Sequence, residues 1–500
     1  MLRREFFATP ALLGAAAPPR TALSLNEDNS HWFVARAGKP LSRQFVASFV
    51  DQYAGTQVRE LLLSANSQRT SYASKVWDPI WKGYDPDGPD DQPLFRSTPA
   101  EARVTSRKWV HTAWSLAQQK IDPYEVWIAR ARTKGLSPWI SMRMNDLHNV
   151  DDPDSYMHAT FWREHPEYRR LPWRAVDWRD RAFDFGHAAV REYHFKLIEE
   201  YCERYDFDGL ELDWMRFGFH FRPGHEWEGG ELLTEFTRRA RRLLDQWEKR
   251  RGHRILLGAR VPSRPQTAIN LGLDGARWAR EGLVQMLVVT PFWASIETDM
   301  PIELWRRLVG DRVILAAGLE LLLRPYHSYK PLGFNTLETV RGAAASLLSR
   351  GADRIYLFNY MDSDTAMKDL ENYPRVLREC GSLVTLEGKA RRHVITYSDT
   401  YAPGEPSGAQ LPKQVDAGQW ASFRLHVGPR MGSAVLRMQI EGMTADALTV
   451  RVNGSDPVPA APAWNEFACW RVGPVAGPVV VDVHSAKAGK IHWVEIAGGN

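Results

Sequence analysis

The chain has 500 residues, of which 44% are hydrophobic and 25% charged, and its 64 basic and 60 acidic residues leave a formal net charge of +4. This balance is ordinary for a globular protein and excludes a chain built around a strongly basic nucleic-acid-binding face. No stretch approaches the roughly 20 apolar residues of a membrane span, so we expect no integral membrane segment. Three widely separated cysteines without C-x-x-C spacing predict neither a disulfide framework nor a zinc site, and we expect no cofactor.

The amino terminus resembles a bacterial twin-arginine signal peptide. Arg3 and Arg4 precede two phenylalanines, and a short run of small and apolar residues extends from 8 to 17. Such segments direct export and are removed from the mature protein, so we expect residues 1–24 to be a signal peptide. The protein is therefore expected to be exported to the periplasm or the outside of a bacterial cell.

Beyond this segment, short apolar runs alternate with helical patterns. The expected strands span residues 31–36, 58–64, 136–144, 205–217, 254–261, 284–292, 312–320 and 353–361. Apolar residues at helical spacing occur at 42–53, 106–119, 123–134, 190–201, 231–251, 275–281, 302–308 and 336–349. Eight strands, each after the first preceded by a helix, predict an α/β fold in which residues 25–388 form an eight-stranded parallel (β/α)8 TIM barrel. A doubly wound sheet is the alternative, but no G-x-G-x-x-G follows the first strand.

Residues 389–500 show a different pattern. Short runs at 393–397, 434–438 and 448–452 are separated by turn signals such as Asn453-Gly454. This pattern predicts a C-terminal β-sandwich. Such an accessory domain either binds carbohydrate or only braces the barrel, and both interpretations stay open.

The stretch 205–217 carries the strongest chemical signal. Side chains alternate in a strand, so Glu211 and Asp213 share one face while two leucines take the other. The outside of a parallel barrel packs on apolar helices, so the acidic pair should face inward. Buried carboxylates are costly unless paired or used, which favours Asp213, nearest the carboxyl end, as the reactive group and Glu211 as its neighbour. The alternative is that both form salt bridges with Arg143 or Arg260.

The segment F-D-G-L-E-L-D-W at 207–214 resembles the strand-four signature F-D-G-x-D-x-D-x-E of family eighteen chitinases. It is more similar still to the glycosyl hydrolase-like 10 family of barrels, as is R-M-N-D at 143–146. Asp213 and Trp214 are also similar to the strand-four nucleophile motif of α-galactosidase-type barrels. These resemblances imply a glycosidase barrel. Met215 stands where the chitinases have their general acid, so a chitinase mechanism is not implied.

Glycoside hydrolysis uses two carboxyl groups, about 5 to 5.5 Å apart for retention of configuration or about 6.5 to 9.5 Å for inversion. Glu320 ends strand seven and is our candidate proton donor, with Asp213 as nucleophile or base. Glu320 could instead be an ordinary loop carboxylate. Asp146, Glu297 and Asp362, which follow strands three, six and eight, are the alternative partners.

Polar and aromatic side chains near the strand ends predict a carbohydrate substrate, because sugars offer both hydroxyl groups and apolar C–H faces. The expected substrate-binding residues are Glu211, Arg143, Asn145, Asp146, Trp214, Arg216, Arg260, Trp293, Asn359, Tyr360 and Asp362. The loop 146–158 is rich in Asp and His but lacks the EF-hand and H-E-x-x-H spacings, so no metal site is expected.

The sequence as a whole predicts a glycoside hydrolase that acts on a poly- or oligosaccharide. A glycan-binding barrel without catalytic activity is the alternative, which Met215 would fit as a lost acid. A deacetylase acting on a polar polymer is a third hypothesis, and it would require a metal. The first two hypotheses differ for Asp213→Asn, because only an enzyme has turnover to lose.

Overall fold

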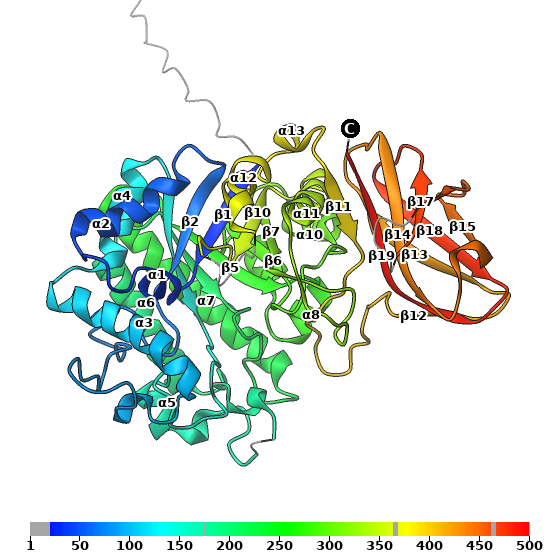
Figure 1. Cartoon of the computed structure of the whole chain (residues 1–500). Coiled ribbons are helices and arrows are strands. Elements are labelled where there is room, and N and C mark those ends of the chain that lie inside the picture. The colour runs from blue at the N-terminus through cyan, green and yellow to red at the C-terminus, as the bar shows by residue number, and fades with distance from the viewer. Residues whose placement is uncertain (1–20, 175, 364–368, 462–466, 500) are drawn as a thin grey trace, which may run out of the picture.

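Eight parallel strands close into a barrel in the computed structural model, which describes residues 21–174, 176–363, 369–461 and 467–499 (Figure 1). The barrel strands are β1 (Ala22–Glu27), β2 (Val58–Ser64), β3 (Ser137–Arg143), β4 (Gly209–Asp213), β5 (Leu256–Pro262), β6 (Met286–Thr290), β7 (Ile314–Leu319) and β10 (Arg354–Phe358). Each pairs in parallel with its neighbours in the order β1-β10-β7-β6-β5-β4-β3-β2. The predicted TIM barrel is confirmed, and seven of its eight strands lie where the sequence placed them.

Helices surround the barrel (Figure 1). They are α1 (His31–Ala35), α2 (Arg43–Ser48), α3 (Ala100–Gln118), α4 (Pro123–Thr133), α5 (Thr160–Glu164), α6 (Ala188–Arg204), α7 (Glu226–Arg251), α8 (Pro265–Asn270), α9 (Gly275–Arg280), α10 (Ile302–Val309), α11 (Leu337–Ser349), α12 (Tyr373–Glu379) and α13 (Leu383–Leu386). Their ends follow local chemistry: Asp122 caps α4 through the backbone N–H of Tyr124, and Gly252 ends α7 with a φ of 74°. Within the described ranges, no helix is both long and apolar enough to span a bilayer.

The predicted first strand, residues 31–36, is wrong, because His31–Ala35 forms α1 and the first barrel strand is Ala22–Glu27. In β1 leucines pack against the helices while Ser24 faces the interior, where its hydroxyl donates to Glu60 over 2.8 Å. The barrel therefore begins before the expected boundary at residue 25. Apart from residues 21–24, the expected signal peptide lies outside the described residues.

The barrel interior is filled by side chains. A cluster of buried apolar residues consists of Leu62, Trp139, Met286, Val288, Ala316, Tyr356 and Phe358. Toward the amino ends of the strands, Arg354 donates to Glu60 over 2.9 Å. In β4, Gly209 gives the ring of Trp139 its space, since a Cβ at that position would lie 2.2 Å from the ring.

We expect Gly209→Ala to lower the free energy of unfolding by about 3 kcal/mol, because the added methyl group would overlap the Trp139 ring inside a packed barrel. Gly230→Ala in α7 is the matched control, since its Cβ would meet only Gly272 at an ordinary 3.5 Å and alanine favours a helix. Urea unfolding of both variants measures the difference. Equal stability of the two variants would contradict the packing described for Gly209.

The carboxyl-terminal part is a sandwich of two antiparallel sheets, which confirms the predicted β-sandwich. Its strands are β11 (Arg391–Val394), β12 (Lys413–Val415), β13 (Trp420–His426), β14 (Ser433–Glu441), β15 (Leu448–Val452), β16 (Val458–Ala460), β17 (Ala468–Val472), β18 (Pro478–Ser485) and β19 (Gly489–Gly499). One sheet has the order β11-β19-β14-β17-β16, with β12 also paired to β19, and the other has the order β13-β18-β15. The short pair β8 (Leu322–Leu323) and β9 (Gly333–Phe334) belongs to the barrel loops.

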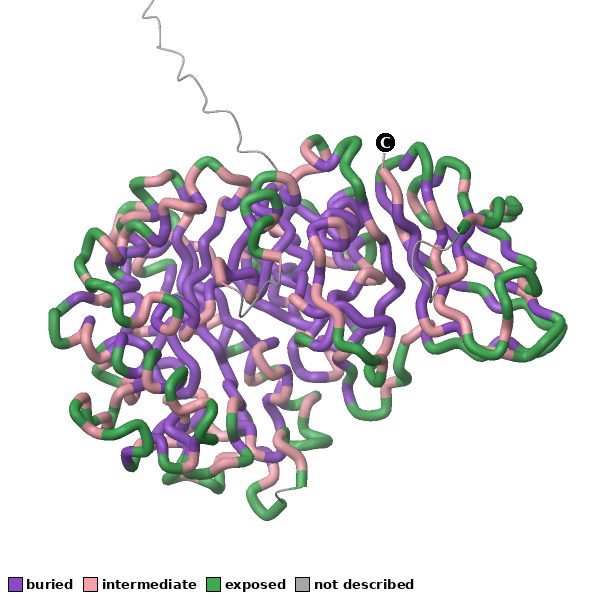
Figure 2. The backbone as a smooth tube through the Cα atoms, viewed as in Figure 1, coloured by how far each residue is buried: buried purple, intermediate pink, exposed green. Residues whose placement is uncertain are grey.

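Barrel and sandwich pack directly against each other. A Cβ on Gly342 of α11 would lie 2.0 Å from the backbone oxygen of Arg392 in β11, so helix and strand approach as closely as glycine allows. The Tyr326 hydroxyl lies 2.7 Å from Nδ1 of His492. Figure 2 shows buried backbone on both sides of this junction. The sandwich is thus fixed to the barrel by contacts on several elements.

Candidate active site

The two carboxyl groups predicted to catalyse hydrolysis share one arginine. Asp213 ends β4 and Glu320 directly follows β7, so both lie at the carboxyl end of the barrel. Arg260 of β5 donates from Nη1 to both oxygens of Asp213 over 3.1 Å and from Nη2 to Glu320 over 2.9 Å. All three side chains are buried. Carboxyl groups that share one guanidinium lie within about 10 Å of each other, which covers the separations used by glycosidases.

Asp213 is fixed by the backbone that follows it. The N–H groups of Met215 and Arg216 donate to its Oδ1 over 3.0 and 2.9 Å. Together with Arg260, these donors fix the orientation of the Asp213 carboxyl group. Met215, at the position of the chitinase acid, is fully buried and offers only a thioether.

Glu320 is suited to hold a proton. Burial raises its pKa to about 8, against the opposing charges of Arg260 and Arg216. Its backbone oxygen accepts from Nδ2 of Asn335 over 2.6 Å and from the hydroxyl of Tyr360 over 3.0 Å. The backbone at the end of β7 is therefore held in place, and burial favours the protonated form of the Glu320 carboxyl.

Glu211 lies one layer deeper in β4, facing the same way as Asp213. Its Oε2 accepts from the hydroxyls of Ser141 over 2.6 Å and Tyr356 over 2.9 Å. Burial, and after it the charge of Asp213, raises the pKa of Glu211 to about 7. Glu211 is thus enclosed by the barrel and acts on a substrate only through its neighbours.

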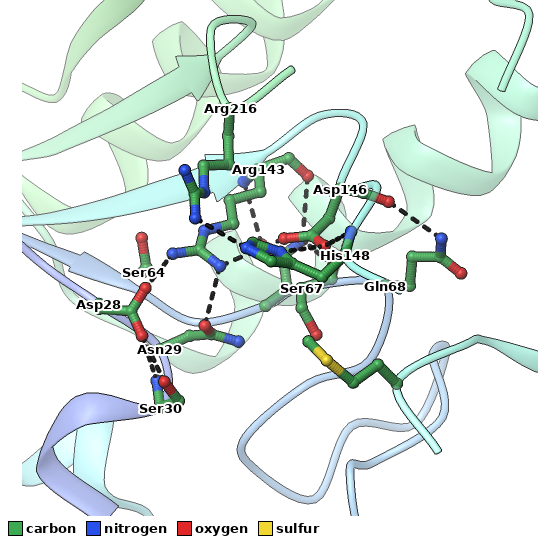
Figure 3. A network of polar contacts seen from close by, with 12 residues as sticks. Asp28, Asn29, Ser30, Ser64, Ser67, Gln68, Arg143, Asp146, His148 and Arg216 are labelled. Carbon is green, nitrogen blue, oxygen red and sulfur yellow. Dashed lines mark hydrogen bonds and ion pairs between the residues drawn. The ribbon is translucent and has the colours of Figure 1, made fainter. Parts of the chain in front are cut away.

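A second polar network lies beside this pair and centres on Arg143 (Figure 3). The Arg143 guanidinium binds Asp28 and donates to Asn29 Oδ1 over 3.0 Å and to Asp146 Oδ2 over 3.2 Å. Burial alone would raise the pKa of Asp28, but the charge of Arg143, the hydrogen bonds from Ser30 and the charge of Arg216 together outweigh it, and this pKa falls well below its usual range. Arg143 therefore pairs with Asp28 and Asp146, while Asp213 pairs with Arg260.

His148 connects the two networks. Its Nδ1 lies 2.8 Å from Oδ1 of Asp146, and its Nε2 lies 2.8 Å from Nη2 of Arg216 (Figure 3). A guanidinium can only donate, so Nε2 accepts and the proton on Nδ1 is donated to Asp146. Because the backbone N–H of Arg216 binds Asp213, this chain of contacts reaches the carboxyl pair.

Asp28, Asn29 and His148 are site residues that the sequence analysis missed. Asp28 directly follows β1, so a correct placement of that strand would have put it at the carboxyl end of the barrel. His148 was considered only as a metal ligand. The signal available for it was its position in the loop after β3, two residues beyond Asp146.

Two predicted substrate-binding residues, Trp214 and Asn145, make contacts within the protein. Trp214 is fully buried and packs in the helix layer, with Trp278 at 6.4 Å between ring centroids, so the prediction that it contacts substrate is wrong. The cause is strand alternation, because Asp213 faces inward and its neighbour must face outward. Asn145 donates to the backbone oxygens of Phe183 and Phe219, which uses its amide group to order two loops.

The predicted residues after β10 also have structural partners. The Tyr360 hydroxyl binds the backbone of Glu320, as described above. Asp362 accepts from Arg36 Nη1 over 2.9 Å, at the end of α1, and from Gln52 over 2.9 Å, in the 3-10 turn Phe49–Tyr53 that follows α2. Asn359 is partly buried and has a left-handed backbone with a φ of 61°.

Glu297, an alternative partner for Asp213, is held apart from it. The carboxyl is buried, binds the Ser263 hydroxyl and accepts from Arg264 over 2.9 Å. Burial raises its pKa. The structure thus joins Asp213 to Glu320 through Arg260 and gives Glu297 a separate arginine.

Four aromatic side chains form what we call the aromatic rim: Trp178, Phe217, Phe292 and Trp293, from the loops after β3, β4 and β6. The rings of Trp178 and Phe292 are nearly parallel at 6.3 Å, and Phe217 lies 5.3 Å from Phe292. Trp293 at the end of the rim is 45% exposed. Phe217 also lies 5.2 Å from the ring of His148, which places the rim next to the polar networks.

A cavity of about 240 Å³ adjoins the Arg143 network. Its lining includes Asn29, Ser30, Trp109, Arg143 and His148. Hydroxyl, amide and aromatic groups around such a space match a sugar. Neither Asp213 nor Glu320 lines it, so this cavity is adjacent to the carboxyl pair and does not open onto it.

No family model matches the sequence, and no curated protein matches it. Among solved structures, the chain is similar to alpha-L-fucosidase isoenzyme 2 from Paenibacillus thiaminolyticus, at 10% identity over 93% of this chain and 99% of that one, with a TM-score of 0.42. It is also similar to the PgaB (BpsB) glycoside hydrolase domain from Bordetella bronchiseptica, at 10% identity over 72% and 98% of the two chains, with a TM-score of 0.41. A cycloisomaltooligosaccharide glucanotransferase from Paenibacillus sp. matches at 9% identity over 96% of this chain, which spans only 58% of that protein, with a TM-score of 0.36. Likeness at this level says nothing about the chemistry of the present chain.

Proposed function

We propose that the chain is a glycoside hydrolase acting on a poly- or oligosaccharide, with Glu320 as proton donor and Asp213 as nucleophile or base. The observation that carries this proposal is the sharing of Arg260 by two carboxyls in different environments. Asp213 accepts two backbone N–H bonds, whereas burial raises the pKa of Glu320 to about 8. Acid-assisted cleavage of a glycosidic bond requires a proton donor with a raised pKa and a second carboxyl group at the mouth of the same barrel.

The chemistry follows from these roles. Glu320 gives its proton to the glycosidic oxygen while the bond from that oxygen to the anomeric carbon breaks. Asp213 either attacks the anomeric carbon, forming an ester that water then hydrolyses, or takes a proton from the attacking water. The positive charge that develops on the sugar ring is stabilised by the Asp213 carboxylate.

A sugar can reach this pair only if the side chains that cover it move. Arg216 is the candidate, because it is partly exposed and its guanidinium lies 5.5 Å from the ring of Phe358, against which Arg260 also packs. Its guanidinium also binds His148, which lines the 240 Å³ cavity, so a movement of Arg216 would free the side of His148 that faces it.

The direct test is release of reducing ends from chitin, cellulose, xylan, starch and the glycan strands of peptidoglycan by the full chain. Cleavage of at least one of these that is absent in Asp213→Asn supports the proposal. Cleavage by Asp213→Asn at the wild-type rate, or by neither protein, contradicts it.

For any polysaccharide that is cleaved, we expect kcat/KM to fall as the pH rises through about 8, because the protonated form of Glu320 is the active one and is lost above its pKa. Glu320→Gln should remove most of the activity and also this fall of kcat/KM at basic pH, which we call the basic limb of the pH profile. Glu211→Gln is the matched control, since it removes another buried carboxyl with a raised pKa but should leave the limb in place. If Glu211→Gln shifts the basic limb and Glu320→Gln does not, Glu211 is the proton donor in place of Glu320.

A glycan-binding barrel without turnover is the second candidate. It is favoured by the complete burial of Asp213 and Glu320 and by the position of the cavity beside Arg143 and His148. In that case hexasaccharides bind to the wild type and to Asp213→Asn with equal affinity, and neither protein releases reducing ends.

A further inference from the structure

The segment that connects the barrel to the sandwich reaches back to the barrel mouth. Asp399 lies in this connector, between β11 and β12, and its carboxylate accepts three consecutive backbone N–H groups. The donors are Phe292 over 2.7 Å, Trp293 over 2.8 Å and Ala294 over 2.6 Å. Successive N–H groups that converge on one anion form a strong anchor, because each bond is charge-assisted. The loop after β6 is therefore shaped around a side chain more than 100 positions away in sequence.

The connector itself is fastened at two further points. Thr396 Oγ1 accepts from the backbone N–H of Thr298 over 3.0 Å. Glu405 accepts from the Thr267 hydroxyl of α8 over 2.7 Å and also binds Asn270 (the gold segment beside α8 in Figure 1). Asp399 is thus presented by a segment held on both sides.

The loop that Asp399 anchors carries half of the aromatic rim. Phe292 packs against Phe217 and Trp178, and Trp293 exposes its ring at the end of this row. The rim adjoins His148, which binds Arg216. Flat aromatic surface beside hydrogen-bonding side chains matches a sugar ring, which has an apolar face and a hydroxyl edge.

We propose that the aromatic rim is a sugar-stacking subsite of the proposed active site and that Asp399 of the connector is its positioning residue. This inference rests on the proposed glycan substrate. Asp399 also acts at a distance on the proton donor: burial is the main cause of the raised pKa of Glu320, and the negative charge of Asp399 adds to it. The connector to the sandwich is thereby part of the substrate site as well as a link between domains.

Three full-length variants test the subsite on the polysaccharide that the wild type cleaves fastest. Trp293→Ala should raise KM about tenfold with little change in kcat, since a stacked ring adds substrate affinity. Asp399→Asn should raise KM to a similar degree. In addition, its basic pH limb should move to lower pH, because the charge that helps to raise the pKa of Glu320 is gone. Glu405→Gln weakens only the contact of the connector with Thr267 of α8. It should change neither KM nor the position of the basic pH limb.

Amide hydrogen exchange shows whether Asp399 holds the loop. Faster exchange at 292–294 in Asp399→Asn, with the rest of the barrel unchanged, is the expected result. Unchanged exchange and unchanged KM in that variant overturn the positioning role, and unchanged KM in Trp293→Ala overturns the subsite.

The test also separates this inference from the proposed function. If the wild type cleaves nothing, binding of cellohexaose, chitohexaose, xylohexaose and maltohexaose is measured by calorimetry. A hexasaccharide that binds the wild type and binds Trp293→Ala about tenfold more weakly supports the subsite although hydrolysis has failed. Absence of binding to all four overturns both.

Discussion

Asp213→Asn is expected to lower kcat on the cleaved polysaccharide by about 10³-fold, equivalent to about 4 kcal/mol of transition-state stabilisation. Asparagine keeps the size of the side chain and one oxygen for the backbone N–H groups of Met215 and Arg216. It has no negative charge to attack the anomeric carbon or to stabilise the charge that develops there. Release of reducing ends under saturating substrate measures the effect.

Loss of a buried charge can also destabilise the fold, so a control with the same structural cost is needed. Glu60→Gln provides it, because Glu60 is buried, binds Arg354 in the same barrel and lies toward the opposite end. This variant should lose stability but keep kcat per folded molecule. A comparable fall of kcat in Glu60→Gln would assign the Asp213 effect to the fold.

Arg260→Met should lower the free energy of unfolding by about 3 to 5 kcal/mol at neutral pH, because it leaves two buried carboxyls without their shared cation. Without Arg260, the pKa of Glu320 rises further above its unfolded value. A raised pKa in the folded state favours folding below the unfolded pKa, and this contribution is lost as the pH rises through the folded pKa. The variant should therefore lose less stability at pH 4 than at pH 8.

Urea unfolding at both pH values measures this loss. Arg238→Met is the control, because Arg238 forms exposed ion pairs with Glu235 and Glu281 on the helix surface. No change in stability is expected for it. If Arg260→Met is as stable as the control, Arg260 does not hold Asp213 and Glu320 together. The observation on which the proposed site rests is then contradicted.

Most of the barrel could be predicted because each strand is a continuous apolar run between helical patterns. β1 could not, since its inward residues are polar and its first three residues fall within the segment 1–24 assigned to a signal peptide. α1 was mistaken for a strand because His31, Trp32 and Phe33 are consecutive buried residues at a helix end, with no visible helical period.

The contact of Asp213 and Glu320 through Arg260 could be anticipated, because strands of one barrel direct their last side chains to the same end. The role of Asp399 could not, since no local pattern shows that a connector folds back onto a loop of the barrel. For Trp214, in contrast, a local pattern that predicts its direction was present in the sequence. Its position next to an inward-facing Asp213 already determined that it would face outward, although an aromatic side chain at a strand end also matches the apolar face of a sugar.

The seam that closes the barrel has a consequence for the growing chain. Ala22 of β1 pairs with Arg354 of β10, so the two sides of this seam leave the ribosome on the order of 20 to 60 s apart at usual rates of synthesis. Until then β1 can pair only with β2, and its other edge exposes unpaired N–H and C=O groups. In the finished barrel, the pairing of β1 with β10 removes the last free strand edge. In the nascent chain, the same edge of β1 is unpaired and open to misassembly.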